Sequence, residues 1–212
     1  RSGKVRGFEA LLRWRHPEHG VMLPAAFLSE AEENGLIVEI GNRVLDQACA
    51  FARELRHAGF TALPVAVNVS HREYSRPTFI AGIAERMSRY GLPPGTLEIE
   101  IPEADLIRNP GLGRDLAAQL RDVGAMLSID QFGRGISDLN FLQQLSVRQV
   151  KLSKAAVHNI ANHGRGGSLA KALIDIGRNL DITVVGEAVE TEAQVEFLRS
   201  HGCDQMQGQW FC

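Results

Sequence analysis

The segments LEIEI (97–101), GLGRDLAAQLRDV (111–123) and MLSID (126–130) follow one another as strand, helix and strand. The turn Asn109-Pro110-Gly111 separates the first strand from the helix, since proline and glycine mark turns. Both strands end in apolar runs that carry an acidic residue at or near their carboxyl end. A strand–helix–strand unit of this kind predicts an α/β fold with parallel strands.

The same alternation continues in both directions along the chain. Strand-like segments are predicted at Val5–Arg13, Leu63–Asn68, Leu97–Ile101, Met126–Asp130, Gln149–Leu152, Thr183–Gly186 and, more weakly, Asp204–Gln207. Helices are predicted at Pro24–Glu33, Ile37–Ala58, Pro77–Tyr90, Gly111–Val123, Leu169–Leu180 and Glu192–His201. This order suggests a closed parallel barrel or a doubly wound sheet. A doubly wound dinucleotide fold would need a glycine-rich turn after an early strand, and Gly133-Arg134-Gly135 is too short a match.

Composition excludes several classes of protein. The 212 residues are 44% hydrophobic and 23% charged, which is ordinary for a globular chain and favours one domain over residues 1–212. A net charge of −2 disfavours a strongly basic DNA-binding protein. No apolar run is long enough for a membrane span, and no signal peptide opens the chain. Three widely spaced cysteines fit a reducing compartment. The ends suggest a piece of a longer protein.

Polar residues stand at corresponding ends of successive strands. They are Glu9 in the first strand segment, Asn68, Glu100, Asp130, Lys151, Glu187 and, after the last strand, Gln207. In a parallel barrel these ends meet at one mouth, where sites are built. Several carboxylates with an amide oxygen predict a site for a hard cation such as Mg²⁺ or Mn²⁺ rather than Zn²⁺. Phosphate-ester chemistry is the usual task of such a site.

Each of these residues also has a purely structural interpretation. Glu100 or Glu187 could cap a helix or pair with an arginine, and Asn68 could be a turn or cap residue. Lys151 could be a solvated lysine whose stem lies on an apolar surface. The pair His16 and His19 belongs to a loop and not to a metal-binding helix. Their shared position at strand ends is what favours a functional site.

Ordered sequence blocks resemble the EAL domain, the bacterial cyclic di-GMP phosphodiesterase family. The first block is Glu9-Ala10-Leu11 with Arg13-Trp14, and His16-Pro17-Glu18 and Ala31–Ile37 follow. The later blocks are Asn68-Val69-Ser70, Glu98–Glu103, Asp130–Gly133, Lys151–Ser153, Glu187–Thr191 and Gln207-Gly208. The resemblance covers essentially the whole chain.

The resemblance implies a modified TIM (β/α)8 barrel with its active site at the C-terminal mouth. The family's first strand is expected before Arg1 and its last helix after Cys212. By matching position, the ligands of a first Mg²⁺ or Mn²⁺ would be Glu9, Asn68, Glu100 and Asp130. Glu187 would activate the attacking water, and Lys151 would hold that water or the phosphate. Leu11, Arg13 and Gln207 would contact substrate, and Glu103 would steady the loop after Asp130.

Three departures from the family pattern fall near this chemistry. Gln131 replaces an aspartate that is expected to bind a second metal, and an amide offers a single uncharged oxygen. Ser153 replaces another aspartate. Arg134 brings a guanidinium into the loop, which continues as Ile136-Ser137-Asp138. These changes make the rim more positive, which disfavours a second divalent cation but not a phosphate.

Three functions remain open from the sequence. The first is a cyclic di-GMP receptor with an impaired second-metal site and weak or no hydrolysis. The second is an active Mg²⁺- or Mn²⁺-dependent phosphodiesterase that produces pGpG, and the third is a protein-interaction module without nucleotide binding. The resemblance also implies sensor or GGDEF-type domains elsewhere in the parent chain, a cytoplasmic domain whose parent can be membrane-tethered, and compatibility with a homodimer.

Overall fold

The computed structural model describes residues 3–134, 139–161 and 166–211, so the predicted departures at Ile136, Ser137 and Asp138 lie outside the described residues. The chain divides into two compact units. The N-terminal unit comprises Val5–Glu100 and Gln119–Met126. The C-terminal unit comprises Ile101–Ala118 and Leu127–Cys212, with Arg1–Lys4. Whether residues 1–212 form a single domain stays a prediction.

Parallel strands form the centre of the N-terminal unit. Strand β1 (Phe8–Ala10) pairs with β4 (Val65–Asn68), and β4 pairs with β5 (Leu97–Pro102). The register places Glu9 opposite Ala66 and Asn68 opposite Glu100. Residues Leu97 to Ile101 of β5 are all buried, as expected for a strand covered on both faces.

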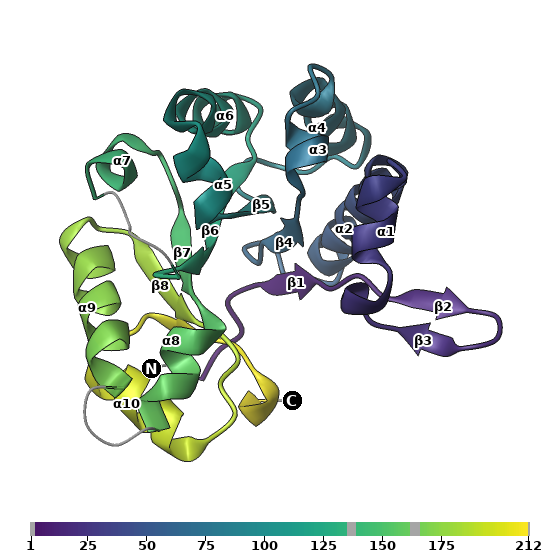
Figure 1. Cartoon of the computed structure of the whole chain (residues 1–212). Helices are drawn as coiled ribbons and strands as arrows, with labels where there is room; N and C mark the ends of the chain where they lie inside the picture. The colour runs from purple at the N-terminus through teal and green to yellow at the C-terminus, as the bar shows by residue number, and fades with distance from the viewer. Residues whose placement is uncertain (1–2, 135–138, 162–165, 212) are drawn as a thin grey trace. The chain divides into compact units, whose positions relative to one another are not determined.

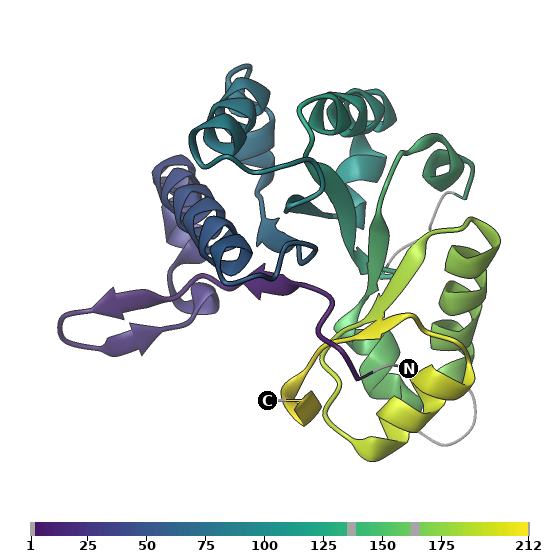
Figure 2. The same ribbon diagram turned by 180° about the vertical axis from the view of Figure 1, so that it is seen from behind.

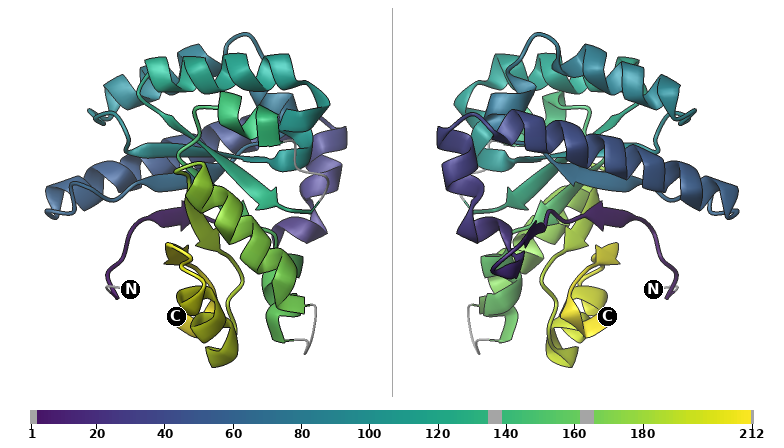
Figure 3. Two further views of the ribbon diagram at one scale, coloured as in Figure 1. Left: turned by 90° about the vertical axis from the view of Figure 1, so that its left-hand side faces the viewer. Right: turned by 90° about the vertical axis from the view of Figure 1, so that its right-hand side faces the viewer.

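Amphipathic helices cover this sheet. Helix α2 (Ile37–His57) buries Leu45, Ala48, Cys49 and Ala52, which recur at helical spacing and form one face. It contacts β4 and α4 (Phe79–Arg89), and Figure 3 shows its length along the unit. The predicted helix Pro24–Glu33 is divided into η1 (Pro24–Ala26) and α1 (Leu28–Glu33).

An antiparallel hairpin that the sequence did not predict follows β1. Its strands are β2 (Trp14–His16) and β3 (Gly20–Met22), and Figure 1 shows it extending away from α1. The predicted strand Val5–Arg13 is therefore too long, because only Phe8–Ala10 pairs with β4. In the hairpin turn, His16 Nδ1 accepts the backbone N–H groups of Glu18 and His19, a structural role.

The C-terminal unit is a parallel sheet in chain order, with helices beside it. Its strands are β6 (Met126–Phe132), β7 (Gln149–Leu152), β8 (Thr183–Gly186) and β9 (Gln205–Met206), and β7 and β8 have the predicted bounds. Helix α9 (Gly166–Asn179) packs against β7 and β8. Figure 2 shows α9 and α10 (Glu192–Ser200) on this part of the chain. The buried centre includes Ile129, Phe132, Leu152, Ile174 and Leu198.

Short helices were missed because a few residues carry too little periodicity for a prediction. They are α3 (His71–Tyr74), α5 (Glu103–Arg108), α7 (Leu139–Gln144), α8 (Lys154–His158), η2 (Asn159–Ala161) and η3 (Gln209–Phe211). The longer helix α6 (Pro110–Asp122) agrees with the prediction to within one residue at each end. No helix among the described residues is both long and apolar enough to cross a membrane.

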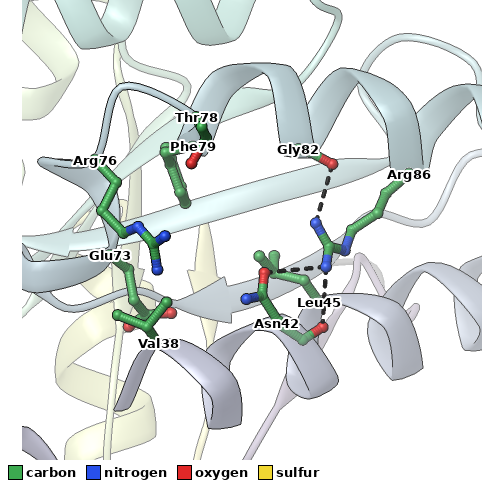
Figure 4. A pocket seen from close by; sticks show the side chains of 9 residues that line it. All are labelled: Val38, Asn42, Leu45, Glu73, Arg76, Thr78, Phe79, Gly82 and Arg86. Carbon is green, nitrogen blue, oxygen red and sulfur yellow. Dashed lines mark hydrogen bonds between the residues drawn. The ribbon is translucent and has the colours of Figure 1, made fainter. Parts of the chain in front are cut away.

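A buried carboxylate belongs to the packing of the N-terminal unit. Glu73 lies in a small pocket of about 80 Å³ between α2, α3 and α4, shown in Figure 4. Its Oε2 accepts hydrogen bonds from the Ser70 backbone N–H at 2.8 Å and the Ser70 hydroxyl at 2.6 Å, which makes a capping box for α3. A Cβ at Gly41 of α2 would collide with the Glu73 carboxylate, so a larger residue there would displace this carboxylate. Burial raises the pKa of Glu73, although the bonds from Ser70 oppose this.

We predict that Glu73→Gln weakens the pH dependence of stability. A carboxyl group whose pKa is raised in the folded state stabilises that state most at low pH, and this stabilisation is lost as the pH rises through the folded pKa. Glutamine can still accept a hydrogen bond from Ser70 but does not ionise. The free energy of unfolding, measured in urea between pH ~4 and pH ~8, should fall less with rising pH in Glu73→Gln than in the original chain. Glu54→Gln on the exposed face of α2 is the control, and identical pH profiles for Glu73→Gln and the original chain would contradict the prediction.

Candidate functional site

Three predicted metal ligands share one face of the N-terminal sheet. The Asn68 side-chain Nδ2 donates to Glu9 Oε1 at 2.7 Å, across the β1–β4 pair. Asn68 is also the register partner of Glu100, and the Val69 N–H donates to the Glu100 carbonyl at 3.0 Å. Parallel pairing thus places Asn68 between the two glutamates at the carboxyl ends of the strands.

These three residues have a suitable donor set for a hard divalent cation. Because Asn68 directs its Nδ2 toward Glu9, its Oδ1 is the atom that could bind a cation, beside the carboxylates of Glu9 and Glu100. Oxygen ligands of this kind suit Mg²⁺ or Mn²⁺. Within the described part of the chain, no three or more His, Cys, Asp and Glu side chains gather into a metal-binding group. The N-terminal set reaches three ligating side chains only with the Asn68 amide.

A buried ion pair joins two other predicted residues in the C-terminal unit. Lys151 Nζ lies 2.8 Å from Glu187 Oε1, and the side chains are only 3% and 12% exposed. The register of β7 and β8 explains the contact, because Lys151 is opposite Val185 and Glu187 follows the end of β8. The alternative interpretation of Lys151 as a solvated lysine is therefore wrong. An ammonium group in this position can hold a carboxylate in place and attract an anion.

The end of β6 and the turn that follows it contain Asp130 and two of the departures from the family pattern, Gln131 and Arg134. Asp130 Oδ1 accepts the Gln131 backbone N–H at 2.6 Å, and Arg134 Nη1 donates to Gln131 Oε1 at 2.7 Å. Glu103, at the start of α5, accepts the Gly133 N–H at 3.0 Å through Oε2. Glu103 thus contacts the backbone of Gly133, and its role in steadying the loop stays a prediction. A Cβ at Gly133 would collide with Leu173, so this turn also needs its glycine.

Ser153 has a structural role at the start of α8. Its side chain accepts the Ala156 N–H at 3.4 Å as an N-cap, and the residue is 4% exposed. Aspartate is an equally good N-cap. The helix end is therefore compatible with either residue.

The predicted substrate contacts lie in different surroundings. Leu11 and Arg13 line a pocket of about 390 Å³ between β1 and α2, and Leu11 is 55% exposed. The Arg13 guanidinium donates to the neighbouring Leu12 carbonyl at 2.6 Å. Gln207 follows β9 and is fixed through its backbone, donating to Gly186 and accepting from Val189. Gly208 supports this close approach, because a Cβ there would collide with the Val189 backbone.

Sequence reasoning missed a second row of polar residues inside the strands. Glu98 is 1% exposed and lies two residues before Glu100, on the same side of β5. In the C-terminal unit, Ser128 and Gln149 are buried register partners that precede Asp130 and Lys151 by two residues. Polar residues repeating with the two-residue period of a strand were the available signal.

Breaking the Lys151–Glu187 pair is predicted to destabilise the chain strongly. Lys151→Met leaves a buried carboxylate without its cation and should lower the free energy of unfolding by about 3–5 kcal/mol. Adding Glu187→Gln should recover part of the loss, because neither residue of the pair then carries a buried charge. Urea unfolding of both variants measures this. Lys171→Met, which breaks the exposed Lys171–Asp175 pair of α9, should have a small effect, and an equal loss in both single variants would contradict the prediction.

Comparison with known proteins identifies relatives over nearly the whole chain. The bifunctional diguanylate cyclase/cyclic di-GMP phosphodiesterase MucR of Pseudomonas aeruginosa is 36% identical over 207 residues, which are 98% of this chain and 30% of MucR. The cyclic di-GMP phosphodiesterase NbdA of the same species is 36% identical over 210 residues, 99% of this chain and 27% of NbdA. The chain therefore spans less than a third of these relatives.

Solved structures share the fold. The MucR phosphodiesterase in complex with c-di-GMP superposes with a TM-score of 0.94 and 36% identity, covering 97% of this chain and 83% of that structure. The FimX EAL domain from Pseudomonas aeruginosa, bound to c-di-GMP, has a TM-score of 0.89 at 24% identity, covering 99% and 84%. These likenesses confirm the predicted modified TIM-barrel fold. The EAL domain model matches residues 1–212, and the chain belongs to the EAL domain family.

Proposed function

We propose that this domain binds cyclic di-GMP at the carboxyl ends of its strands and hydrolyses it weakly or not at all. Support for this ligand comes from the similarity of the chain to the MucR phosphodiesterase, which was solved in complex with c-di-GMP. Support from this chain comes from its own polar strand ends, which carry oxygen ligands in one unit and a buried ion pair in the other. Both features suit a phosphate ester and its counter-cation.

The proposed cation is a single Mg²⁺ or Mn²⁺ held by Glu9, Asn68, Glu100 and Asp130. When bound, it would supply positive charge for the phosphate and acidify an attacking water. Glu187 is proposed to take the proton of that water, since a carboxylate is a general base. Lys151 keeps the Glu187 carboxylate oriented through their 2.8 Å contact. This arrangement would perform in-line hydrolysis to pGpG, given sufficient charge at the phosphate.

Other residues are proposed to bind the nucleotide or position the site. Arg13 and Gln207 have long polar side chains suited to phosphate or base edges, and Leu11 would provide an apolar contact. Glu103 has a positioning role, because its carboxylate holds the Gly133 N–H in the turn after β6. All of these contacts could serve binding of the nucleotide alone, without hydrolysis.

The proposal of weak hydrolysis rests on the contact between Gln131 and Arg134. The Gln131 Oε1 atom accepts a hydrogen bond from the guanidinium at 2.7 Å, so the only oxygen of this amide side chain faces a cationic group of the protein. A carboxylate at this position would offer two charged oxygens to a second metal ion. With Gln131 in place of an aspartate, we expect the site to bind one divalent cation rather than two.

An active phosphodiesterase is the second candidate, and it also has a specific observation in its favour. The buried Lys151–Glu187 pair and the Glu9–Asn68 contact are both formed, and both hold groups that hydrolysis would use. If one cation suffices for turnover, these groups would support it. An interaction module that has lost nucleotide binding is the remaining alternative from the sequence.

The wider setting is proposed from the relatives. MucR is named as both a diguanylate cyclase and a phosphodiesterase, which supports a parent chain with a GGDEF-type or sensor domain beside this one. We propose that the domain works in the bacterial cytoplasm, where cyclic di-GMP is a messenger. A homodimer is a further proposal, and none of these settings involves DNA.

We predict that Gln131→Asp with Ser153→Asp raises turnover. A cation that contributes about 4 kcal/mol to the transition state corresponds to roughly 10³-fold in rate, so the double variant should hydrolyse cyclic di-GMP faster by up to this factor. The assay incubates the protein with cyclic di-GMP and excess Mg²⁺ or Mn²⁺ and separates the nucleotides by chromatography. Aspartate at position 153 can still cap α8, but the position is buried, so urea unfolding of the double variant is measured beside its turnover.

Controls separate the three candidate functions. Abundant pGpG from the original chain, absent in Glu9→Ala, would establish the active enzyme and overturn the receptor. No gain in the double variant would contradict the role given to Gln131. A melting temperature that cyclic di-GMP leaves unchanged would favour the interaction module, because a ligand specific for the folded state must raise it.

A further inference from the structure

The turn from Asp130 to Arg134 is held by several contacts at once. Gln131 has a φ of 56°, a left-handed conformation that is unfavourable for a residue with a side chain. Its backbone N–H donates to Asp130 Oδ1 at 2.6 Å, and its carbonyl accepts the Arg134 N–H at 3.2 Å. Together with the hydrogen bond between Glu103 and Gly133, these contacts hold the backbone of Arg134 in one position.

The Arg134 side chain is in turn oriented by Gln131. One hydrogen bond, from Nη1 to Gln131 Oε1, holds the guanidinium near the carboxyl end of β6. Residue 134 is exposed, and within the described part of the chain its guanidinium makes no ion pair with a carboxylate. A guanidinium has five N–H donors, so most of its capacity remains for another acceptor.

We propose that Arg134, positioned by Gln131, is a phosphate-binding residue that lets this domain bind cyclic di-GMP without a divalent cation. The inference rests on the proposed function, which supplies the ligand, and adds the group that recognises it. Planar guanidinium groups match phosphate oxygens with two parallel N–H donors. The contact between Gln131 and Arg134 thus occupies the Gln131 oxygen that could have bound a cation. The Arg134 guanidinium supplies a positive charge instead of that cation.

The charge of Arg134 favours an anion at this turn. The neighbouring Asp130 carboxylate accepts the Gln131 N–H through Oδ1, and Lys151 is paired with Glu187. Arg134 is therefore the cationic side chain of this turn that carries no compensating carboxylate among the described residues. A cyclic dinucleotide has two phosphodiester groups, each with one negative charge and two acceptor oxygens.

The test compares the affinity for cyclic di-GMP with and without a divalent cation. Isothermal titration calorimetry on the 212-residue chain measures Kd in EDTA and in excess Mg²⁺. The original chain should bind in EDTA, and Arg134→Ala should weaken this binding by about tenfold or more. Arg134→Lys should recover part of the affinity, because it keeps the charge but not the planar fork. Gln131→Ala should weaken binding less than Arg134→Ala.

Arg114→Ala is the matched control. Arg114 Nη1 donates to Gln144 Oε1 at 2.8 Å, the same kind of exposed arginine–glutamine contact, between α6 and α7 instead of after β6. Its Kd should equal that of the original chain. Equal Kd values for Arg134→Ala and the original chain in EDTA would overturn the inference, as would binding by the original chain only in Mg²⁺, and both results leave the proposed function standing. No binding in either buffer would overturn the proposed function itself.

Discussion

Parallel strand pairing is the constraint on which the candidate site depends. Side chains alternate between the two faces of a strand. A polar residue near the carboxyl end therefore points toward the candidate site only if it lies at every second position along the strand, on the same face as the other site residues. In the N-terminal unit, the register of β4 with β5 sets Asn68 beside Glu100, and its register with β1 brings Glu9 within hydrogen-bonding distance of Asn68. In the C-terminal unit, the register of β7 with β8 brings Lys151 to Glu187.

Substitutions in the strands and in the turn after β6 are expected to affect stability differently. The strand-borne pair Lys151–Glu187 is buried, and altering one of its members would leave an uncompensated charge, whereas the Asn68–Glu9 contact is exposed. The turn after β6 is different, because its shape depends on Gly133, on Glu103 and on backbone hydrogen bonds. The side chains at 131 and 134 can therefore change without disturbing the sheet. The fold of the family is therefore compatible with different side chains at positions 131 and 134.

Position 153 shows that a departure in sequence need not be a loss in structure. The sequence comparison treats Ser153 as a missing carboxylate, whereas in the structure its hydroxyl caps α8 from a buried position. Aspartate and serine share this capping ability, so the fold is satisfied by both. Only the charge differs, and its effect would fall on the neighbouring site.

The sequence by itself determined the α/β class, the strands β7 and β8 to the residue, the long helices α2 and α6 to within one residue at each end, and the set of polar strand ends. Periodicity over many residues and strong turn signals made this possible. Only the tertiary structure decided the hairpin β2–β3, the shortest helices and the Gln131–Arg134 contact. Elements this short carry no periodicity. Side-chain pairs such as Lys151 with Glu187 depend on strand register, which packing sets and no local pattern encodes.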